Sequence, residues 1–540
     1  MVNCLRKRLA VSRLLDRANK KVGVSGAATL LMVVMLLGQL LGFFRYKIIN
    51  ANFPALGPDS TDAFFAAFKI PDFFFYTLAA GALGVAFMPV LSERLEKGDK
   101  RGVWALSNSL MNLLAIIMAV VGVVIFVFAE PLIHYVVAPN LPPVQLENAV
   151  NIMRIIAFNP LLFAMVGVLT STQQTMGRFF FFAIGPLFYN TAIIISVFIF
   201  RNSLGIVGLG VGALIGAILQ LGIAAMGLLG ANYHWSPKIL WRSNDFKTIL
   251  RRLPARSIDQ GMDSINSIAE TNFATRLGVG NVTYYENAFI LHTAPILLIG
   301  TAISTAAFPK LTERLAQNRY DLFRKEFLQI LRAMIWIAMP TIVVCFFARA
   351  YFARLIFSAA APEISLVFGF FVGAILFRII FAIISRWFYA QKDTVTPLIV
   401  SLFIIALNLG LAFHLSKPGV YGIAGLAMAQ SVVAAIEVVI LFAIMVYRDR
   451  KLFDAKFWGG VVKILSVTGF SSLAAYSGVQ LFPLLATDRG IFTLGSKLGL
   501  ITVATLAVHV LVSLVFELEE AKPVVAKAKK FILKPIKISY

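Results

Sequence analysis

An all-α membrane protein with fourteen transmembrane helices is the fold class that the sequence predicts. Hydrophobic residues make up 59% of the 540 residues, and charged residues only 14%, against about 25% in a typical soluble domain. Apolar runs of roughly 20 residues, each long enough to cross a bilayer core, recur along the whole chain. One sequence motif also occurs twice, which predicts two parallel six-helix repeats followed by two C-terminal helices.

The predicted spans follow these apolar runs. The first 21 residues form a basic leader that resembles the start of a signal peptide, but the apolar run 22–44 is too long for such a peptide. We therefore expect a retained first span with a cytoplasmic N-terminus. The fourteen predicted spans are 24–44, 62–91, 105–129, 148–175, 183–200, 204–230, 255–277, 286–310, 328–347, 364–390, 395–415, 420–447, 457–482 and 491–516.

The distribution of basic residues predicts the orientation of these spans. With both termini in the cytoplasm, the inside segments hold 33 Lys and Arg residues, the outside loops hold 7, and 9 lie within spans. One missed helix would invert every later loop and destroy this bias. The same mapping accounts for the net charge of +23, so we expect no nucleic-acid partner.

Two pairs of similar segments predict the internal duplication. Ala86-Phe-Met-Pro-Val-Leu-Ser-Glu-Arg-Leu95 recurs as Ala306-Ala-Phe-Pro-Lys-Leu-Thr-Glu-Arg-Leu315, and Ile206-Val-Gly-Leu209 recurs as Ile423-Ala-Gly-Leu426. Chance similarity of small-residue helices is the alternative. A tandem copy of six spans keeps its orientation, and parallel repeats are a transporter architecture with the substrate site between the lobes. The expected parts are a leader (1–21), an N-lobe (22–230), a cytoplasmic linker (231–254), a C-lobe (255–447), spans thirteen and fourteen (448–520) and a basic tail (521–540).

Span seven, predicted over 255–277, carries a stripe of charged residues. Arg256, Asp259, Asp263 and Glu270 follow the three-and-four spacing that places residues on one helix face. Such a face does not suit lipid. It either lines a water-filled cavity or pairs with charges on neighbouring helices, and the sequence leaves both readings open.

Spans one and two carry three further candidate charges. Asp62 and Lys69 are seven residues apart, so they share nearly the same face of span two, and Arg45 lies at the outer end of span one. Pro71 predicts a bend that frees backbone groups beside a substrate pathway. Asp62 could instead cap its own helix. The candidate substrate-binding residues are therefore Arg45, Asp62, Lys69, Arg256, Asp259, Asp263 and Glu270.

Neither a metal site nor a nucleotide-driven pump is predicted. The two cysteines, Cys4 and Cys345, and the five scattered histidines show no metal-ligand spacing. No Gly-x-x-x-x-Gly-Lys-[Ser/Thr] loop is present in the sequence. We expect a transporter without covalent chemistry or cofactor, driven by the membrane potential or by an ion gradient whose ion the sequence does not identify.

Four stretches resemble the motifs of a known family. They are Leu41-Gly-Phe-Phe-Arg45, Asp62-Ala-Phe-Phe-Ala-Ala-Phe-Lys-Ile-Pro71, Gly81-Ala-Leu-Gly-Val-Ala-Phe-Met-Pro89 and Phe388-Tyr-Ala-Gln-Lys-Asp-Thr-Val-Thr-Pro397. With the fourteen spans, they make the chain similar to the lipid II flippase family (MurJ/MviN) of the multidrug/oligosaccharidyl-lipid/polysaccharide exporter superfamily. The resemblance covers nearly the whole chain.

The resemblance implies a cargo and a mechanism. It implies two lobes around a cationic cavity, and a groove made with spans thirteen and fourteen for a polyprenyl tail. The implied cargo is the undecaprenyl-pyrophosphate-linked peptidoglycan precursor, moved from the inner to the outer leaflet of a bacterial cytoplasmic membrane, with cell-wall synthesis proteins as candidate partners. Arg45 and Asp62 fall on matching motif positions and inherit cavity roles from the resemblance.

The chain departs from the family pattern at four positions where arginine is expected, namely Gln39, Phe75, Tyr76 and Ala288. Three alternatives therefore stay open. The chain could flip another polyprenyl-linked glycan, or export drugs by coupling to a cation held by intramembrane acids. It could also be a non-transporting scaffold in a wall-synthesis complex.

Overall fold

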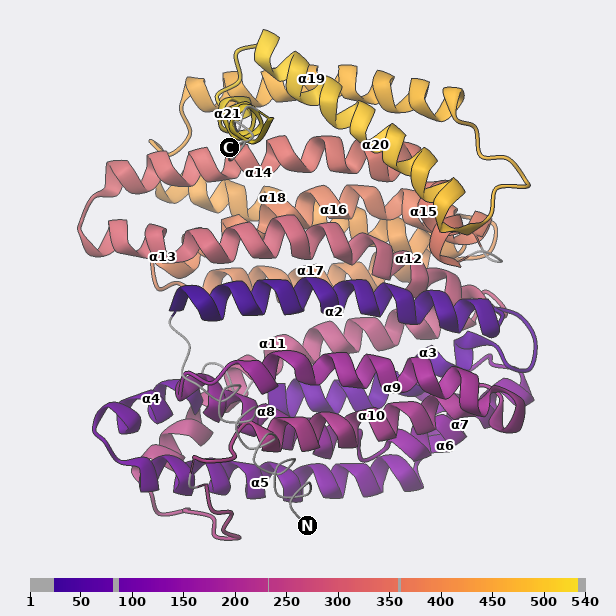
Figure 1. Ribbon diagram of the computed structural model, residues 1–540, viewed down its shortest axis with the longest axis vertical. Coiled ribbons are helices and arrows are strands. Elements are labelled where there is room, and N and C mark those ends of the chain that lie inside the picture. The colour runs from indigo at the N-terminus through magenta and orange to yellow at the C-terminus, as the bar shows by residue number, and fades with distance from the viewer. Residues whose placement is uncertain (1–23, 81–86, 232, 358–360, 533–540) are drawn as a thin grey trace, which may run out of the picture. The chain divides into compact units, whose positions relative to one another are not determined.

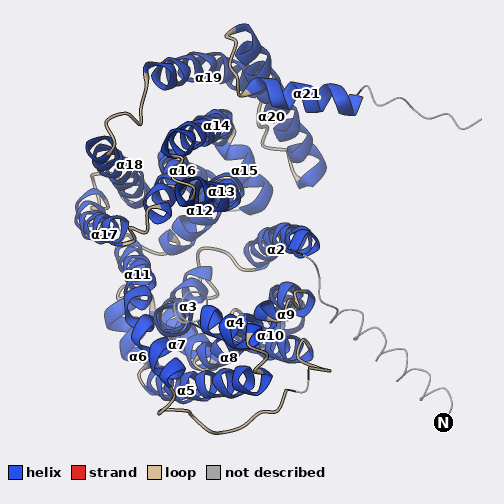
Figure 2. Ribbon diagram, turned by 90° about the vertical axis from the view of Figure 1, so that its left-hand side faces the viewer, coloured by secondary structure: helices blue, strands red, loops and turns tan. Residues whose placement is uncertain are grey.

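The computed structural model describes residues 24–80, 87–231, 233–357 and 361–532, and among these it leaves out the side chains of 24–29, 32, 79–80, 252–260 and 527–532. The described residues form helices and connecting loops without a strand (Figures 1 and 2), which confirms the all-α class. Contacts divide the chain into two compact units that meet in sequence at Thr283 and Tyr284. The predicted basic leader, 1–21, lies outside the described residues.

Twelve helices within the described residues are long and apolar enough to cross a membrane. Two predicted spans are not among them. The range 62–91 includes residues 81–86, which are not described. The range 255–277 falls on α11 (Asn244–Thr275), a helix that is too polar to count as a candidate membrane span. The multi-pass class is thus confirmed, while the count of fourteen stays a prediction.

The first unit is a bundle of long helices. Helix α9 packs along α10 and α2, α5 packs on α8, and α11 lies against α3 and the π-helix η1. Its elements are α2 (Val24–Asn52), α3 (Thr61–Phe74), η1 (Phe75–Ala80), α4 (Met88–Glu96), α5 (Lys100–Val127), α6 (Ala129–Pro131), η3 (Leu132–Val137), α7 (Pro143–Ile156), α8 (Asn159–Thr175), α9 (Phe180–Leu204), α10 (Val207–Met226) and α11 (Asn244–Thr275).

The second unit is a bundle around α16. Helix α16 packs against α14 and α18, α17 packs on α18, and the pair α19 and α20 lies against α14 (Figure 2). The elements are α12 (Asn281–Pro295), η4 (Ile296–Thr301), α13 (Ala302–Ala316), α14 (Tyr320–Phe347), α15 (Arg349–Phe357), α16 (Ala361–Ala390), α17 (Val395–Leu415), α18 (Ile423–Arg448), α19 (Ala455–Leu481), α20 (Gly490–Val515) and α21 (Ala521–Ile532).

Both copies of the duplicated Glu-Arg-Leu motif end in the same backbone turn. Gly98 and Asn318 hold φ angles of 76° and 56°, in the left-handed region that Gly, and next Asn, occupies most easily at a helix end. The next amide closes the turn in each copy, Asp99 to the Arg94 carbonyl at 3.0 Å and Arg319 to the Arg314 carbonyl at 2.9 Å. A helix of 28 residues follows each turn, α5 and α14.

The second repeated marker also begins in matching backbone. Gly205 precedes α10 with φ 56° and ψ −138°, and Gly422 precedes α18 with φ 54° and ψ −135°. A six-residue π-helix interrupts the second span of each repeat, as η1 and η4. These matches support the predicted duplication.

The lobe boundaries themselves remain a prediction. The division at Thr283 groups α11 with the first unit, whereas the repeat pattern assigns it to the C-lobe. The tail predicted over 521–540 begins as α21, and 533–540 lie outside the described residues.

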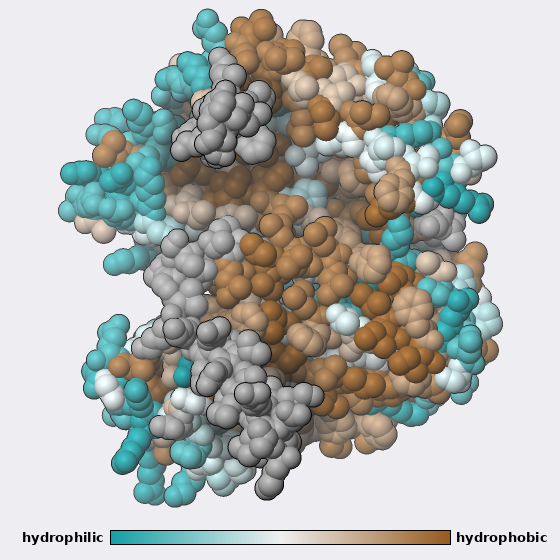
Figure 3. Space-filling view, in the orientation of Figure 1, coloured by the Kyte–Doolittle hydropathy of each residue, from teal (hydrophilic) through white to brown (hydrophobic). Residues whose placement is uncertain are grey.

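Large apolar side chains are exposed along the middle of the helices. On α5, Ile116, Val120 and Val123 are 57%, 61% and 53% exposed. Figure 3 shows apolar residues over the middle of the visible helices and hydrophilic residues toward their ends. A soluble monomer rarely exposes such large apolar patches, so this surface is that of a protein embedded in lipid.

Candidate functional site

Asp62 lies at the first turn of α3 and is 1% exposed. One carboxylate oxygen accepts hydrogen bonds from the amide and the hydroxyl of Thr283, at 2.7 and 2.6 Å, and the other accepts from the amide of Gly280 at 2.6 Å. The carboxylate therefore binds amides at the start of α12, where the helix dipole favours a negative charge. The alternative that Asp62 caps its own helix is wrong, because Ser60 caps α3.

The polar stripe of α11 meets α3 through Lys69. The Lys69 ammonium donates a hydrogen bond to the Ser267 hydroxyl at 2.8 Å. One turn further along α11, Glu270 is 3% exposed and accepts a hydrogen bond from Asn266 at 3.0 Å. Both hydrogen bonds lie inside the first unit, and neither is a pair of opposite charges.

The other three charged residues of the stripe are Arg256, Asp259 and Asp263. Asp263 is exposed, one turn before Ser267. Arg256 and Asp259 lie on α11, but their side chains lie outside the described residues. The choice between the cavity and pairing interpretations for these three residues, and the substrate role predicted for them, therefore stay predictions.

Arg45, on α2, contacts α9. Its Nη1 donates to the Asn190 side-chain oxygen at 2.8 Å, and the guanidinium lies over the Tyr46 ring at 4.4 Å from the centroid. An arginine has five N–H donors in a planar fork. Among the described residues the half-buried guanidinium thus has one hydrogen bond and one ring contact, and its substrate role stays a prediction.

The second unit contains an ion pair that was not predicted from the sequence, between the buried Glu437 and Arg378, whose side chain is 31% exposed. Glu437 on α18 is 1% exposed, and its carboxylate accepts from Arg378 on α16 and from Ser401 on α17, both at 2.8 Å. Each charge looked isolated in the sequence, because nothing in a single span identifies its partner on another. The only signal was the intramembrane position of each charge.

The motif-bearing stretch 388–397 contains Asp393, which holds the start of α17 through hydrogen bonds and an ion pair. Asp393 accepts from the amide and hydroxyl of Thr396, at 3.0 and 2.7 Å, and pairs with Arg448 at 2.6 Å. Burial alone would raise the pKa of Asp393, but these hydrogen bonds and the guanidinium charge outweigh it and lower the pKa to about 2. In this structure the stretch joins the α16–α17 turn to the end of α18.

Metal binding finds no support in the described part of the chain, which brings together no group of three or more His, Cys, Asp or Glu side chains suited to an ion.

A duplicated helical membrane protein with charged groups inside its apolar helices belongs to the class of polytopic transporters. The family model for "Lipid II flippase MurJ" matches residues 55–491, which is well over half of the chain. The chain therefore belongs to the lipid II flippase MurJ family.

Individual relatives agree with this assignment. The lipid II flippase MurJ of Burkholderia cenocepacia is 26% identical over 432 residues, covering 75% of this chain and 81% of that protein. A solved lipid II flippase MurJ in an inward closed conformation matches with a TM-score of 0.73 and 20% identity, over 90% of this chain and 98% of that one. An inward-facing multidrug resistance MATE family transporter of the MOP superfamily matches with a TM-score of 0.63 and 17% identity, over 79% and 98% of the two chains. At such identities the two structures establish the fold alone.

Proposed function

We propose that the chain is a flippase that moves lipid II, the lipid-linked precursor of peptidoglycan, from the inner to the outer leaflet of a bacterial cytoplasmic membrane by alternating access. The observation that carries the proposal is the family match over 55–491, which covers predicted spans two to thirteen. The process is translocation without covalent chemistry or a cofactor, driven by the membrane potential or an ion gradient. Both termini lie in the cytoplasm, as the 33-to-7 distribution of basic residues favours.

The pyrophosphate of such a cargo needs cationic contacts. A guanidinium grips phosphate oxygens in pairs, whereas an ammonium acts as a point charge. Arg45 suits the first role because Asn190 and Tyr46 orient its guanidinium while N–H donors remain. Lys69, oriented by Ser267, suits the second.

Complementation of a bacterium depleted of its own flippase tests the proposal. The wild-type chain should restore growth and the outer-leaflet pool of lipid II, and Arg45→Ala should restore neither at equal protein abundance. Arg45→Lys should stay impaired if the paired grip is required. Lys238→Ala, at an exposed loop position, is the matched control and should act as wild type. Wild-type protein that leaves lipid II in the inner leaflet of such cells would refute the proposal.

A second candidate cargo is another polyprenyl-linked glycan. Two of the positions where arginine was expected are packed: Ala288 is fully buried, and the Phe75 ring meets Phe163 edge-on with centroids 5.6 Å apart. The chain therefore offers fewer cations than the resemblance implied. Vesicles reconstituted with the purified protein distinguish the two cargoes, since only one of the two labelled lipids should become accessible from the opposite leaflet.

A further inference from the structure

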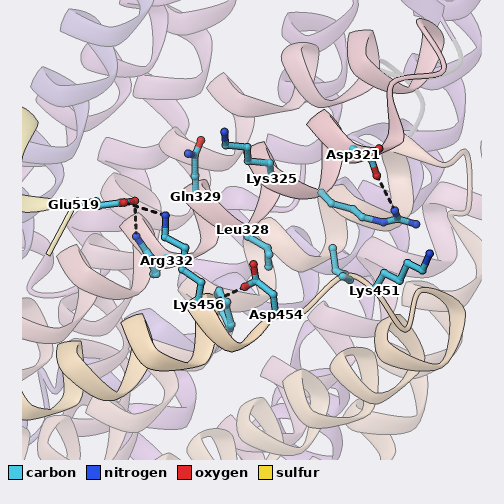
Figure 4. A pocket seen from close by; sticks show the side chains of 12 residues that line it. Asp321, Lys325, Leu328, Gln329, Arg332, Lys451, Asp454, Lys456 and Glu519 are labelled. Atoms are coloured by element: carbon cyan, nitrogen blue, oxygen red, sulfur yellow. Dashed lines mark hydrogen bonds and ion pairs between the residues drawn. The ribbon is translucent and has the colours of Figure 1, made fainter.

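The second unit contains a groove whose charged lining residues are mostly basic. It has a volume of about 380 Å³ and lies between the first half of α14, the α18–α19 connection and the α20–α21 turn. Five of its lining residues are basic, namely Arg324, Lys325, Arg332, Lys451 and Lys456. Figure 4 shows Lys325 and Gln329 extending from α14 on one side of the groove and Lys456 with Asp454 on the other.

Three of these five cations form ion pairs with acidic side chains of the same chain. Arg324 pairs with Asp449 at 2.7 Å, and Lys456 pairs with Glu519 at 3.1 Å. Arg332 binds both Glu519 and Glu520. Lys325 and Lys451 are both exposed, and neither side chain has a hydrogen bond or ion pair to another described residue. Lys325 and Lys451 are therefore the two cations of the groove without an acidic partner among the described residues, although Asp321 and Asp454 also line it.

The floor of the groove is apolar and lies where two predicted spans begin. Leu328 and Phe457 line it, and they are the first residues of predicted spans nine and thirteen. Trp458, the next residue, is 47% exposed, and tryptophan is enriched at the membrane–water boundary. Both flanking loops are assigned to the cytoplasmic side, where the leaflet carries anionic lipids.

We propose that this groove binds the phosphodiester headgroup of an anionic phospholipid of the surrounding bilayer, with Lys325 and Lys451 as its phosphate contacts and Leu328 and Phe457 against the first carbons of its acyl chains. A soluble phosphate compound fits the cations but not the apolar floor. The location at headgroup level therefore favours a lipid. The proposed ligand is a lipid of the bilayer itself, so the proposal does not depend on what the protein flips.

Lipid binding to the purified full-length chain in neutral detergent tests this proposal. The readout is the thermal midpoint of unfolding during titration with phosphatidylglycerol, phosphatidylcholine or inorganic phosphate. Phosphatidylglycerol should raise the midpoint of the wild type. The double variant Lys325→Gln with Lys451→Gln should need about twenty-five-fold more of it, because each cation near a membrane surface contributes roughly fivefold to affinity.

Two matched variants separate the groove from general charge. Lys238→Gln with Lys247→Gln removes two exposed lysines from the first unit and should leave the titration unchanged. Lys325→Arg with Lys451→Arg keeps both charges and should retain binding even if the glutamine variant is less stable. Equal titrations for the wild type and the glutamine groove variant, or no effect of phosphatidylglycerol on the wild type, would overturn the proposal. A groove-dependent effect of inorganic phosphate equal to that of the lipid would also overturn it, since it would identify a soluble ligand.

Discussion

Asp62 places a full carboxylate in a buried position, where three hydrogen-bond donors point at it. Asp62→Asn replaces one acceptor oxygen with an NH₂ group that faces amide donors. Hydrogen bonds to a charged group contribute about 1.5–3 kcal/mol, so we expect a loss of about 2 kcal/mol of stability. Thermal unfolding in detergent and abundance in the membrane measure it. Glu130→Gln, an exposed change in the same unit, serves as the control and should be neutral. A stable, abundant Asp62→Asn protein that fails in transport would assign the carboxylate to the cargo path instead.

The lowered pKa of Asp393 predicts that the stability of the protein depends on pH. Its folded pKa of about 2 lies below the ordinary 3.8, so folding favours the charged form. The resulting stability is complete above about pH 5 and is lost as pH falls through about 4 toward 2. Asp393→Asn should lower stability by on the order of 1 kcal/mol at pH 7, as expected for a partly exposed pair. The gap between the two thermal midpoints should narrow from pH 5 to pH 3. A constant difference between the two thermal midpoints over that range would show that the charge of Asp393 does not contribute to stability.

The turn before α18 requires a glycine. Gly422 has φ 54° and ψ −135°, a region that side chains with a Cβ avoid at a strain of about 1–3 kcal/mol. An added Cβ meets open space there, so Gly422→Ala isolates the backbone strain. Gly410 also has open space but lies inside α17, where alanine is favoured by roughly 0.5–1 kcal/mol. Chemical denaturation should show Gly422→Ala destabilised and Gly410→Ala unchanged or stabilised. Equal effects of the two changes would contradict this account.

The ion pair of Arg378 and Glu437 joins α16 to α18, and its carboxylate is the buried partner. Removing Arg378 leaves that buried charge uncompensated, which costs about 3–5 kcal/mol, whereas replacing both partners with apolar residues is often tolerated. We therefore expect Arg378→Met alone to lower the thermal midpoint strongly, Glu437→Leu alone to lower it less because Arg378 is 31% exposed, and the double change to recover most of the loss. A double-mutant cycle in detergent measures the coupling. Two neutral single changes would mean that water reaches the pair.

Helix existence was predictable from the sequence, but helix ends and partners were not. The apolar run of span one stops near Phe44, whereas α2 continues to Asn52, because backbone hydrogen bonding persists after side chains become polar. Pro71 predicted a bend, but composition does not reveal the π register of η1.

The candidate site shows the same limit. The spacing along α11 predicted a shared polar face, yet the contact of Lys69 with Ser267 depends on how two helices pack. Similarly, Arg378 and Glu437 are 59 residues apart, and no periodicity within a single helix links them.

At the scale of the whole molecule, the distribution of basic residues predicts which loops face the cytoplasm. Lys97 follows the first copy of the motif on the inside, and Lys417 lies in an outside loop. Both residues are exposed. In a background with Cys4→Ser and Cys345→Ser, a membrane-impermeant maleimide should label Lys417→Cys in intact spheroplasts and Lys97→Cys only after lysis. The two sites lie on opposite sides only if the number of spans between them is odd, and the predicted topology places nine there. Labelling of both positions in intact cells would therefore require a helix to be added or lost between them, and would remove the orientation on which the proposed direction of transport depends.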